Sequence, residues 1–365
     1  MTAMSRRSTV IALAVVLLVG VVLWFWRSGD TQPSPLNVTP VEASAQTPQA
    51  QVQPAAQFQK PVKLEGDAGP QLPVPAGTQT LATFGWGSGP QQLGRSRPQE
   101  GNPEAPMSLT VDKAGTVMVL DQLNNRLVRI DKNGQALPPI PLTLQAPQDV
   151  VTAADGTVLV SDRLVDKAVA VMRDGKQVGE LPLEGKGITE GGAVSGIFTS
   201  GTEVYAEREH GDLVTLGTTA GARSTERTEV PGRPTRDGKG FISANIVDAP
   251  GGLALVTAID RPSLSHRFSR SLPLGSAISS LVLLDSDAAG VIFLGAMVAG
   301  QAQNEPLIRV LCLDPLDGRP IGRAELPANM SADETFRELA IGDDGSITYL
   351  QRTESGAQLL RATCR

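Results

Sequence analysis

The side chains best suited to acid–base or metal chemistry in this sequence are its two histidines, His210 and His266. His210 follows the charged run Glu207-Arg208-Glu209, and His266 follows Arg261 at a distance of five residues. A zinc or catalytic site needs two or three such groups that converge on one point, and neither histidine lies in a recognisable triad context. We therefore predict no catalytic residue, no metal site and no cofactor, and the sequence favours a non-enzymatic function.

Motifs for nucleophilic and phosphate chemistry are also missing from the sequence. It contains no Gly-x-Ser-x-Gly nucleophile motif and no Gly-x-x-x-x-Gly-Lys-Ser/Thr phosphate loop. The formal net charge of -6 gives no basic surface, which argues against a nucleic-acid partner. The 38 glycines, 27 prolines and 4% aromatic residues are typical of a chain with many short strands and turns.

The first element predicted from the sequence is an apolar run near the N-terminus, which would anchor the chain in a membrane. Residues 10–26 carry no charge, follow Arg6-Arg7 and precede Arg27. The run exceeds a signal-peptide core of about 7 to 15 residues and reaches the lower limit for a bilayer span, about 17 to 25 residues. We predict a short cytoplasmic N-terminus (1–9) and an uncleaved inner-membrane signal anchor (10–26) that exports the remainder. A peptidase site at Ala43-Ser44-Ala45 is the alternative, but it lies far beyond the apolar run.

A segment of low complexity follows the anchor. Residues 28–77 are rich in proline, glutamine, alanine, serine and threonine, with almost no aliphatic periodicity. Such a composition buries too little apolar surface to offset its conformational entropy. We predict a disordered linker that holds the following domain away from the membrane.

Beyond the linker, one pattern returns six times: an apolar strand, a turn that ends in glycine, and a second apolar strand. Glycine is expected in such hairpin turns because they require positive φ. The turn glycines are separated by 39 to 55 residues, close to the repeat of a four-stranded propeller blade, and they are Gly115, Gly156, Gly201, Gly251, Gly290 and Gly345.

The last repeat contains only three strands before the chain ends at residue 365. An unassigned strand, residues 78–87, precedes the first repeat, and we predict that it supplies the outer strand of the last blade. Closure in this way removes exposed sheet edges. The sequence thus predicts an all-β, six-bladed β-propeller over residues 78–365. A five-bladed or irregular ring remains an alternative, because the fourth repeat leaves little chain for a fourth strand.

The first repeat, residues 107–134, resembles an NHL repeat. The pattern is filled by Val111-Asp112, Gly115, Asp121, Asn124-Asn125-Arg126 and Gly134. The resemblance implies an NHL-like propeller of the kind used largely for interactions. It also implies that Asn125 and Arg126 hold turns and neighbouring blades together rather than carry chemistry.

Propeller enzymes related to this family suggest the alternative function, an exported lactonase- or lyase-like enzyme that uses a channel metal. The lyases depend on several metal-binding histidines, which this chain does not have. The calcium-dependent lactonases place Glu, Asn and Asp in the central channel, where Asn245 and Asp248 are scattered candidates.

Cys312 and Cys364 are the only cysteines. An exported location permits a disulfide, but the two residues occupy equivalent strands of successive repeats. Neighbouring sheets pack about 10 Å apart, whereas a disulfide needs α-carbons within about 7 Å. We predict two buried free thiols, with a disulfide as the alternative.

The loops between the second and third strands of all blades should gather on one face of the ring. They are rich in charges of both signs and in amides, which suits a protein or polar polymer better than a dry small-molecule pocket. We therefore predict a scaffolding module of the bacterial cell envelope that binds a protein partner, with a wall polymer as the alternative ligand. The candidate contact residues are Asn124, Arg163, Asp166, Glu207, Arg208, His210, Arg261, His266, Arg352 and Glu354.

Overall fold

The computed structural model of the protein describes residues 78–300 and 305–364. The predicted N-terminus (1–9), anchor (10–26) and linker (28–77) lie outside these residues. Within the described part of the chain, no helix is long and apolar enough to cross a membrane.

The described residues form six sheets, one per blade, in which all strand pairs are antiparallel except the short parallel pair of β1 and β2 in blade six. The first three blades each have four strands: β3 (Ser108–Val111), β4 (Val117–Asp121), β5 (Arg126–Ile130) and β6 (Ala136–Pro141); β7 (Asp149–Thr152), β8 (Val158–Asp162), β9 (Ala168–Arg173) and β10 (Lys176–Pro182); β11 (Val194–Ser200), β12 (Glu203–Arg208), β13 (Leu213–Thr218) and β14 (Glu229–Val230). Two short 3-10 turns lie in loops, η1 (Gln122–Asn124) and η2 (Gly191–Ala193).

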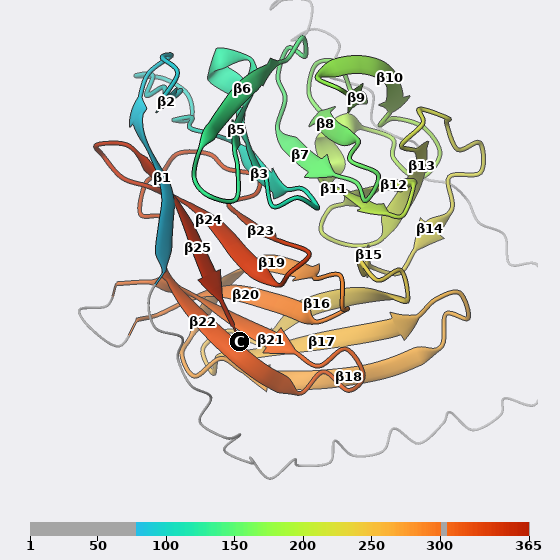
Figure 1. Ribbon diagram of the computed structural model, residues 1–365. Helices are drawn as coiled ribbons and strands as arrows, with labels where there is room; N and C mark the ends of the chain where they lie inside the picture. The colour runs from blue at the N-terminus through green and yellow to red at the C-terminus, as the bar shows by residue number, and fades with distance from the viewer. Residues whose placement is uncertain (1–77, 301–304, 365) are drawn as a thin grey trace, which may run out of the picture. The chain divides into compact units, whose positions relative to one another are not determined.

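The last three blades contain longer strands (Figure 1). They are formed by β15 (Arg233–Pro234), β16 (Gly240–Asp248), β17 (Leu253–Asp260) and β18 (His266–Pro273); β19 (Ile278–Ser286), β20 (Ile292–Val298), β21 (Leu307–Leu313) and β22 (Pro320–Pro327); β23 (Leu339–Ile341), β24 (Ser346–Arg352) and β25 (Ala357–Thr363), with β1 (Gln79–Trp86) and β2 (Gln92–Leu93) completing blade six.

Inner strands of successive blades lie beside one another around a closed ring. β3 lies beside β7, β7 beside β11, β11 beside β15, β16 beside β19, β19 beside β23, and β23 beside β3. The six-bladed propeller is therefore confirmed. We call the end of the ring that carries the loops between second and third strands the top face, and the end that carries the turns between first and second strands the bottom face.

The two ends of the propeller are joined in blade six, as predicted. β1 pairs antiparallel with β25 from Gln79↔Arg361 to Phe84↔Ala357, and Figure 1 shows the blue strand alongside the red one. Phe84 is buried in the apolar cluster between blades six and one. The N-terminal strand thus covers the outer edge that the three C-terminal strands leave open.

The predicted hairpin turns are confirmed in five blades. Gly115, for example, has a φ of 82° and closes the turn between β3 and β4. Blade four is the exception, because the turn near Gly251 joins its second and third strands, β16 and β17, rather than its first and second. The positive-φ residue of that turn is Gly252, with a φ of 70°. The first strand of this blade is the two-residue β15, too short to leave a periodic pattern in the sequence.

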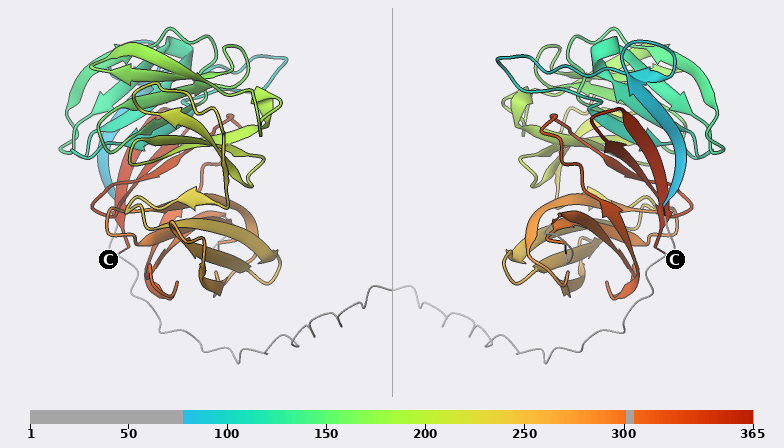
Figure 2. Two further views of the ribbon diagram at one scale, coloured as in Figure 1. Left: turned by 90° about the vertical axis from the view of Figure 1, so that its right-hand side faces the viewer. Right: turned by 90° about the vertical axis from the view of Figure 1, so that its left-hand side faces the viewer.

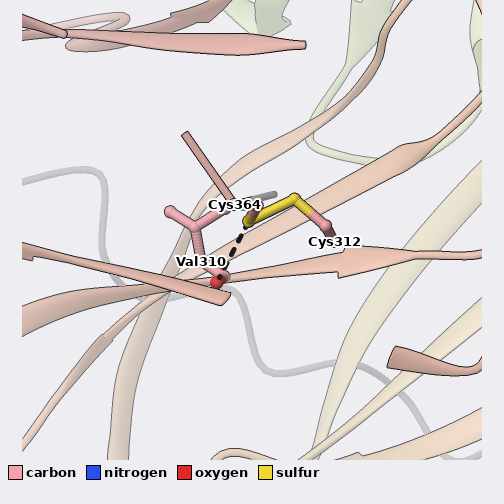
Figure 3. Close-up of a disulfide and its surroundings, with 3 residues drawn as sticks. All are labelled: Val310, Cys312 and Cys364. Atoms are coloured by element: carbon pink, nitrogen blue, oxygen red, sulfur yellow. Dashed lines mark hydrogen bonds between the residues drawn. A yellow bond between two sulfur atoms is a disulfide. The ribbon is translucent and has the colours of Figure 1, made fainter. Parts of the chain in front are cut away.

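The prediction of two free thiols was wrong, because Cys312 and Cys364 form a disulfide with a Cα–Cα distance of 6.1 Å (Figure 3). Gly322 lies opposite Cys312 on β22, and a Cβ on Gly322 would overlap the carbonyl oxygen of Cys364. The missing side chain lets the end of blade six approach blade five more closely than sheets usually pack. Cys364 Sγ also lies 3.8 Å from the carbonyl oxygen of Val310. This is a contact rather than a hydrogen bond, because a disulfide sulfur carries no proton.

Clusters of buried apolar side chains fill the interfaces between adjacent blades. Five such clusters are found among the described residues, between blades six and one, one and two, two and three, four and five, and five and six. Blades three and four are joined instead through ion pairs, Glu207–Arg233 and Glu203–Arg261. Figure 2 (left) shows the yellow chain that passes here from the green blades to the orange ones. This junction is the place where the ring is least filled by apolar packing.

Candidate binding cavity on the top face

A cavity of about 700 Å³ lies at the junction of blades three and four and extends toward the centre of the ring. It opens on the top face, because the loop between β12 and β13 lies at its mouth. It is lined by residues of blades three to six and of the connections between them: Ser195, Phe198, Glu207, residues 210–212, 231–233, 242–245, 280–284 and 335–339.

The cavity exists because the first strand of blade four is cut short. β15 pairs with β16 only through Arg233↔Ile242 and Pro234↔Phe241. If β15 began two residues earlier and kept this register, Pro231 would lie opposite Ala244. Proline has no backbone N–H and cannot extend the ladder. The inner edge of β16 beyond Ile242 therefore faces the cavity instead of a strand.

Arg233 closes the wall of the cavity between blades three, four and five. Its Nε lies 2.7 Å from Glu207 Oε1, and its Nη2 lies 3.1 Å from Glu207 Oε2. Its Nη1 donates to the carbonyl oxygen of Leu284 at 3.0 Å. The guanidinium also lies over the ring of Phe198, 4.6 Å from the centroid. One side chain thus ties three blades together where apolar packing is missing.

Arg337 forms the partition at the inner end of the cavity. It reaches from blade six to blade two, where Nε and Nη2 lie 3.1 and 2.8 Å from the two carboxylate oxygens of Asp149. It also donates to the carbonyl oxygen of Ile197 at 3.1 Å and lies 5.0 Å from the Phe198 ring centroid. A second, smaller cavity of about 110 Å³ shares Arg337 and Phe198 on the bottom side. The two side chains therefore separate two spaces along the channel.

We expect Arg337→Lys to lower the free energy of unfolding by about 1.5–3 kcal/mol, because an ammonium cannot reproduce the forked contact with the buried carboxylate. Chemical denaturation of the two proteins measures the difference. The matched control is Arg319→Lys, because the Arg319 side chain, 3.3 Å from Asp314, is 65% exposed; there we expect a change below about 0.5 kcal/mol. Equal effects of the two substitutions would contradict a structural role for Arg337.

Two carboxyl groups in the cavity have pKa values shifted in opposite directions. Burial raises the pKa of Glu207, but the charge and hydrogen bonds of Arg233, with the Ser195 hydroxyl at 2.9 Å, outweigh it and hold the value below 4.5. Burial raises the pKa of Glu338 above 4.5, although Asn329 and Arg352 act in the other direction. Glu207 is therefore ionised at neutral pH, whereas Glu338 is held as an acid to a higher pH than usual.

The Glu207–Arg233 pair should make the protein sensitive to acid. Because the pKa of Glu207 is lower in the folded than in the unfolded state, the pair stabilises the fold fully above a pH of about 4.5, and this stability is lost as the pH falls through the folded-state pKa. In Glu207→Gln we expect a lower free energy of unfolding at pH 7 and a shallower loss between pH 5 and 3. Denaturation series across this range test it; parallel curves would rule out the pair as a source of acid sensitivity.

Two of the three predicted contact residues of blade three line this cavity. Glu207 and His210 line it, and His210 Nδ1 lies 3.6 Å from Glu207 Oε2 at an exposed position. Arg208 points to the side, where Nη1 donates to the carbonyl oxygen of Gly187 at 2.7 Å and lies 3.3 Å from Glu229. Asn245 lines the cavity from β16, and Asp248 lies at the end of that strand.

In blades one and two, the predicted contact residues of the top face are used mainly inside the molecule. Asn124 donates to the carbonyl oxygen of Gly87 at 3.0 Å. Arg163 donates to Val194 at 3.1 Å and lies over the ring of Phe336. Asp166 is exposed and accepts the N–H of Gln145 at 3.0 Å.

The NHL-like residues of blade one have the structural role that the resemblance implies. Asn125 has a left-handed φ of 48°. Arg126 pairs with Asp121 at 2.8 Å and donates to the carbonyl oxygen of Gln92 at 2.7 Å. The pair thereby fixes blade one to the segment that follows β1.

The two predicted residues of blade six also form internal contacts. Arg352 is buried, lies 3.4 Å from Glu338 and donates to the carbonyl oxygen of Asp333. Glu354 is exposed and receives two hydrogen bonds from Arg97, at 2.8 and 2.9 Å. Glu354 thereby fastens blade six to the segment that follows β1, whereas Arg352 holds the connection that leads into β23.

Arg261 and His266 are not on the top face, so this part of the prediction was wrong. Their loop joins β17 to β18, the third and fourth strands of blade four, and lies at the bottom of the ring. Arg261 contacts Ser200 and Glu203 at the hairpin of blade three. If β16 were the first strand of the blade, the loop after β17 would join the second and third strands and lie on the top face. Because β15 is the first strand, this loop joins the third and fourth strands instead.

The prediction missed exposed apolar side chains at the tips of top-face loops. Leu164 and Val165 follow β8 and are 56% and 51% exposed, and Leu123 is exposed on the equivalent loop of blade one. Met330, on the connection into blade six, is 70% exposed. These apolar residues could be found in the sequence of the loops. The prediction of a polar face was based instead on the charged residues beside them. The top face is thus less polar than predicted.

No group of three or more His, Cys, Asp or Glu side chains that could hold a metal ion occurs in residues 78–300 and 305–364.

The comparisons with known proteins give no family: no family model matches the chain, and no curated protein matches it. The NHL resemblance therefore stays a prediction.

The solved structures that match the chain include two lyases and a set of WD40 repeats. A structure of streptogramin B lyase is 11% identical, with a TM-score of 0.39, and covers 73% of this chain and 96% of its own. The WD40 repeats of RRP9 are 11% identical, with a TM-score of 0.47, and cover 81% of this chain and 99% of their own. Virginiamycin B lyase from Staphylococcus aureus is 12% identical, with a TM-score of 0.38, over 70% and 94%. The six-bladed fold itself rests on the sheet topology described above.

Proposed function

We propose that this chain is a membrane-anchored, exported propeller that binds a protein partner through its top face. The observation that carries the proposal is the cavity of about 700 Å³ that opens on that face between blades three and four. Exposed apolar side chains at Leu123, Leu164, Val165 and Met330 give other parts of the top face an apolar contact surface. Apolar anchors within a polar rim are typical of protein-binding surfaces.

The state of the charged groups favours binding over catalysis. Glu207 is held by Arg233 and Ser195, and Arg337 is held by Asp149. Each of these charged side chains is already bound by another residue of the chain, so it is not free to bind or activate a substrate. The side chains therefore form rigid walls of the cavity. The cavity is therefore better suited to hold a segment of a partner than to transform it.

Two features support an exported location. Disulfides persist in oxidising compartments outside the cytosol, and both cysteines of the chain are joined in one. The uncharged run of residues 10–26 has the length of a membrane anchor. We place the propeller on the periplasmic side of the inner membrane, as a scaffold of an envelope assembly.

Site-specific photo-crosslinking of the full-length chain in cells tests this proposal. We expect a photoreactive residue at position 210 or 164, on the top face, to crosslink a partner protein, and one at position 316, an exposed bottom-face site, to give no such product. Crosslinking only from position 316 would overturn the proposal. Retention of the purified protein by isolated peptidoglycan, without a protein crosslink, would assign the top face to a wall polymer instead.

The second candidate is a hydrolase, and the opposite pKa shifts of Glu207 and Glu338 favour it. Two carboxyl groups with separated pKa values can act as base and acid in one site. Turnover of a panel of esters, lactones and glycosides by the purified protein, lost in Glu338→Gln, would establish it. A panel without turnover would leave the binding function.

A further inference from the structure

We propose that the inner edge of β16 binds an extended, basic peptide segment of the partner by strand addition, in the position that a full-length β15 would occupy. The inference rests on the proposed function of the top face and names the chemistry of the segment that enters its cavity.

The first observation is a free strand edge inside the cavity. Thr235 donates its N–H to the carbonyl oxygen of Gly240 at 2.9 Å, and Arg233 lies opposite Ile242. Because alternate residues of a strand turn their backbone groups to the same side, Ala244 and Ile246 direct N–H and C=O toward the same edge. Among the described residues, no strand pairs with β16 there. The backbone N–H and C=O groups of Ala244 and Ile246 thus provide two donors and two acceptors along this edge.

The second observation is that this edge is accessible, whereas the other side of the strand is fixed. β16 pairs with β17 without interruption from Gly240↔Asp260 to Ile246↔Ala254, so the backbone groups on its outer side are occupied over this stretch. The inner side faces the cavity, which Leu281 and Val282 line from blade five. Ile246 and Val247, at the top of β16, are 37% and 58% exposed. An added strand would find backbone partners on one side and apolar side chains at its flanks.

The charge around the edge selects the kind of peptide. The arginines of the cavity, Arg233 and Arg337, are already paired with Glu207 and Asp149. Asp212 lines the cavity without an ion pair among the described residues, and the carboxylate of Asp248, at the end of β16, accepts the N–H of Gly251 at 2.9 Å. The uncompensated charge is therefore negative, which favours a segment that carries Lys or Arg.

The test uses peptides selected from a displayed library of random dodecamers on the full-length chain in detergent. We expect the selected peptides to contain Lys or Arg, and their affinity to fall by at least about tenfold in Ala244→Pro, the factor that corresponds to 1.4 kcal/mol. Proline removes the free N–H and no hydrogen bond to β17, and thermal unfolding of the variant shows whether its fold is intact. Ala244→Ser keeps the N–H and is the matched control, in which binding should be unchanged.

Two further measurements test the proposal independently of Ala244→Pro. Asp212→Lys should weaken binding of the same peptide. Amide hydrogen exchange of the unmodified chain should show protection of Ala244 and Ile246 when peptide is bound, which decides the question should Ala244→Pro fail to fold.

The outcomes separate this inference from the proposed function. Equal binding by Ala244→Pro and Ala244→Ser, with peptide still crosslinked at position 210, would leave the top face as the binding site and overturn strand addition. Crosslinks only on the bottom face would overturn both. An intramolecular crosslink from position 210 to residues 28–77, or a crosslink to a second copy, would assign the edge to this chain itself and overturn the proposal of a partner peptide.

Discussion

Replacement of Phe84 by alanine is expected to lower the free energy of unfolding by about 3–5 kcal/mol, the usual cost of removing a buried aromatic side chain. Phe84 is 4% exposed and packs in the cluster between blades six and one. It is the buried anchor of β1, the strand that closes the ring by pairing with β25. Its loss therefore leaves a cavity at the seam where β1 and β25 close the ring.

The control for this prediction is Thr83→Ala, on the same strand. Thr83 is exposed and pairs with Gln358 through its backbone alone, so its replacement should change stability by less than about 0.5 kcal/mol. Urea unfolding followed by circular dichroism gives both values. A loss for Phe84→Ala as small as that for Thr83→Ala would show that the seam contributes little to the stability of the ring.

The seam and the repeat could be predicted from the sequence because both are encoded locally. A tight hairpin needs a residue with positive φ, and Gly115 or Gly345 marks it within one strand length of the apolar alternation. A repeat that ends one strand short, together with an unassigned strand before the first repeat, gives the closure without any long-range information.

Blade four and the cavity could not be predicted in the same way. β15 has two residues, so it leaves no periodicity, and the hairpin of β16 and β17 has the same strand–glycine–strand pattern as the start of the other blades. The cavity is produced by the absence of a strand beyond Pro231. Such an absence becomes visible only when the neighbouring strands are in place.

The ion pairs around the channel join residues far apart in the chain. Arg337 and Asp149 are separated by 188 positions, and no spacing in the sequence relates them. The approach that permits the disulfide depends in the same way on Gly322, which is one glycine among 38 until its place opposite Cys312 is known. Contacts between blades are thus the part of the structure that sequence patterns do not carry.

Removal of the disulfide is expected to lower the free energy of unfolding by about 4 kcal/mol. Cys312 and Cys364 are 52 residues apart, and a closed loop of this length restricts the unfolded chain by about that amount in the chain-entropy account. The bond also ties the residue after β25 to blade five, so its loss should free the C-terminal end of the strand that β1 pairs with. The double variant Cys312→Ala/Cys364→Ala, compared with the parent by urea unfolding, measures the effect.

Reductant provides the matched control. Dithiothreitol should destabilise the parent protein and leave the double variant unchanged, because only the parent has a bond to break. Gly322→Ala should act in the same direction, since its Cβ would overlap the carbonyl oxygen of Cys364 and push the two blades apart. An equal response of parent and double variant to reductant would contradict a stabilising bridge. It would also remove the disulfide as support for an exported location, because a bond that stabilises nothing gives no reason to keep the domain in an oxidising compartment.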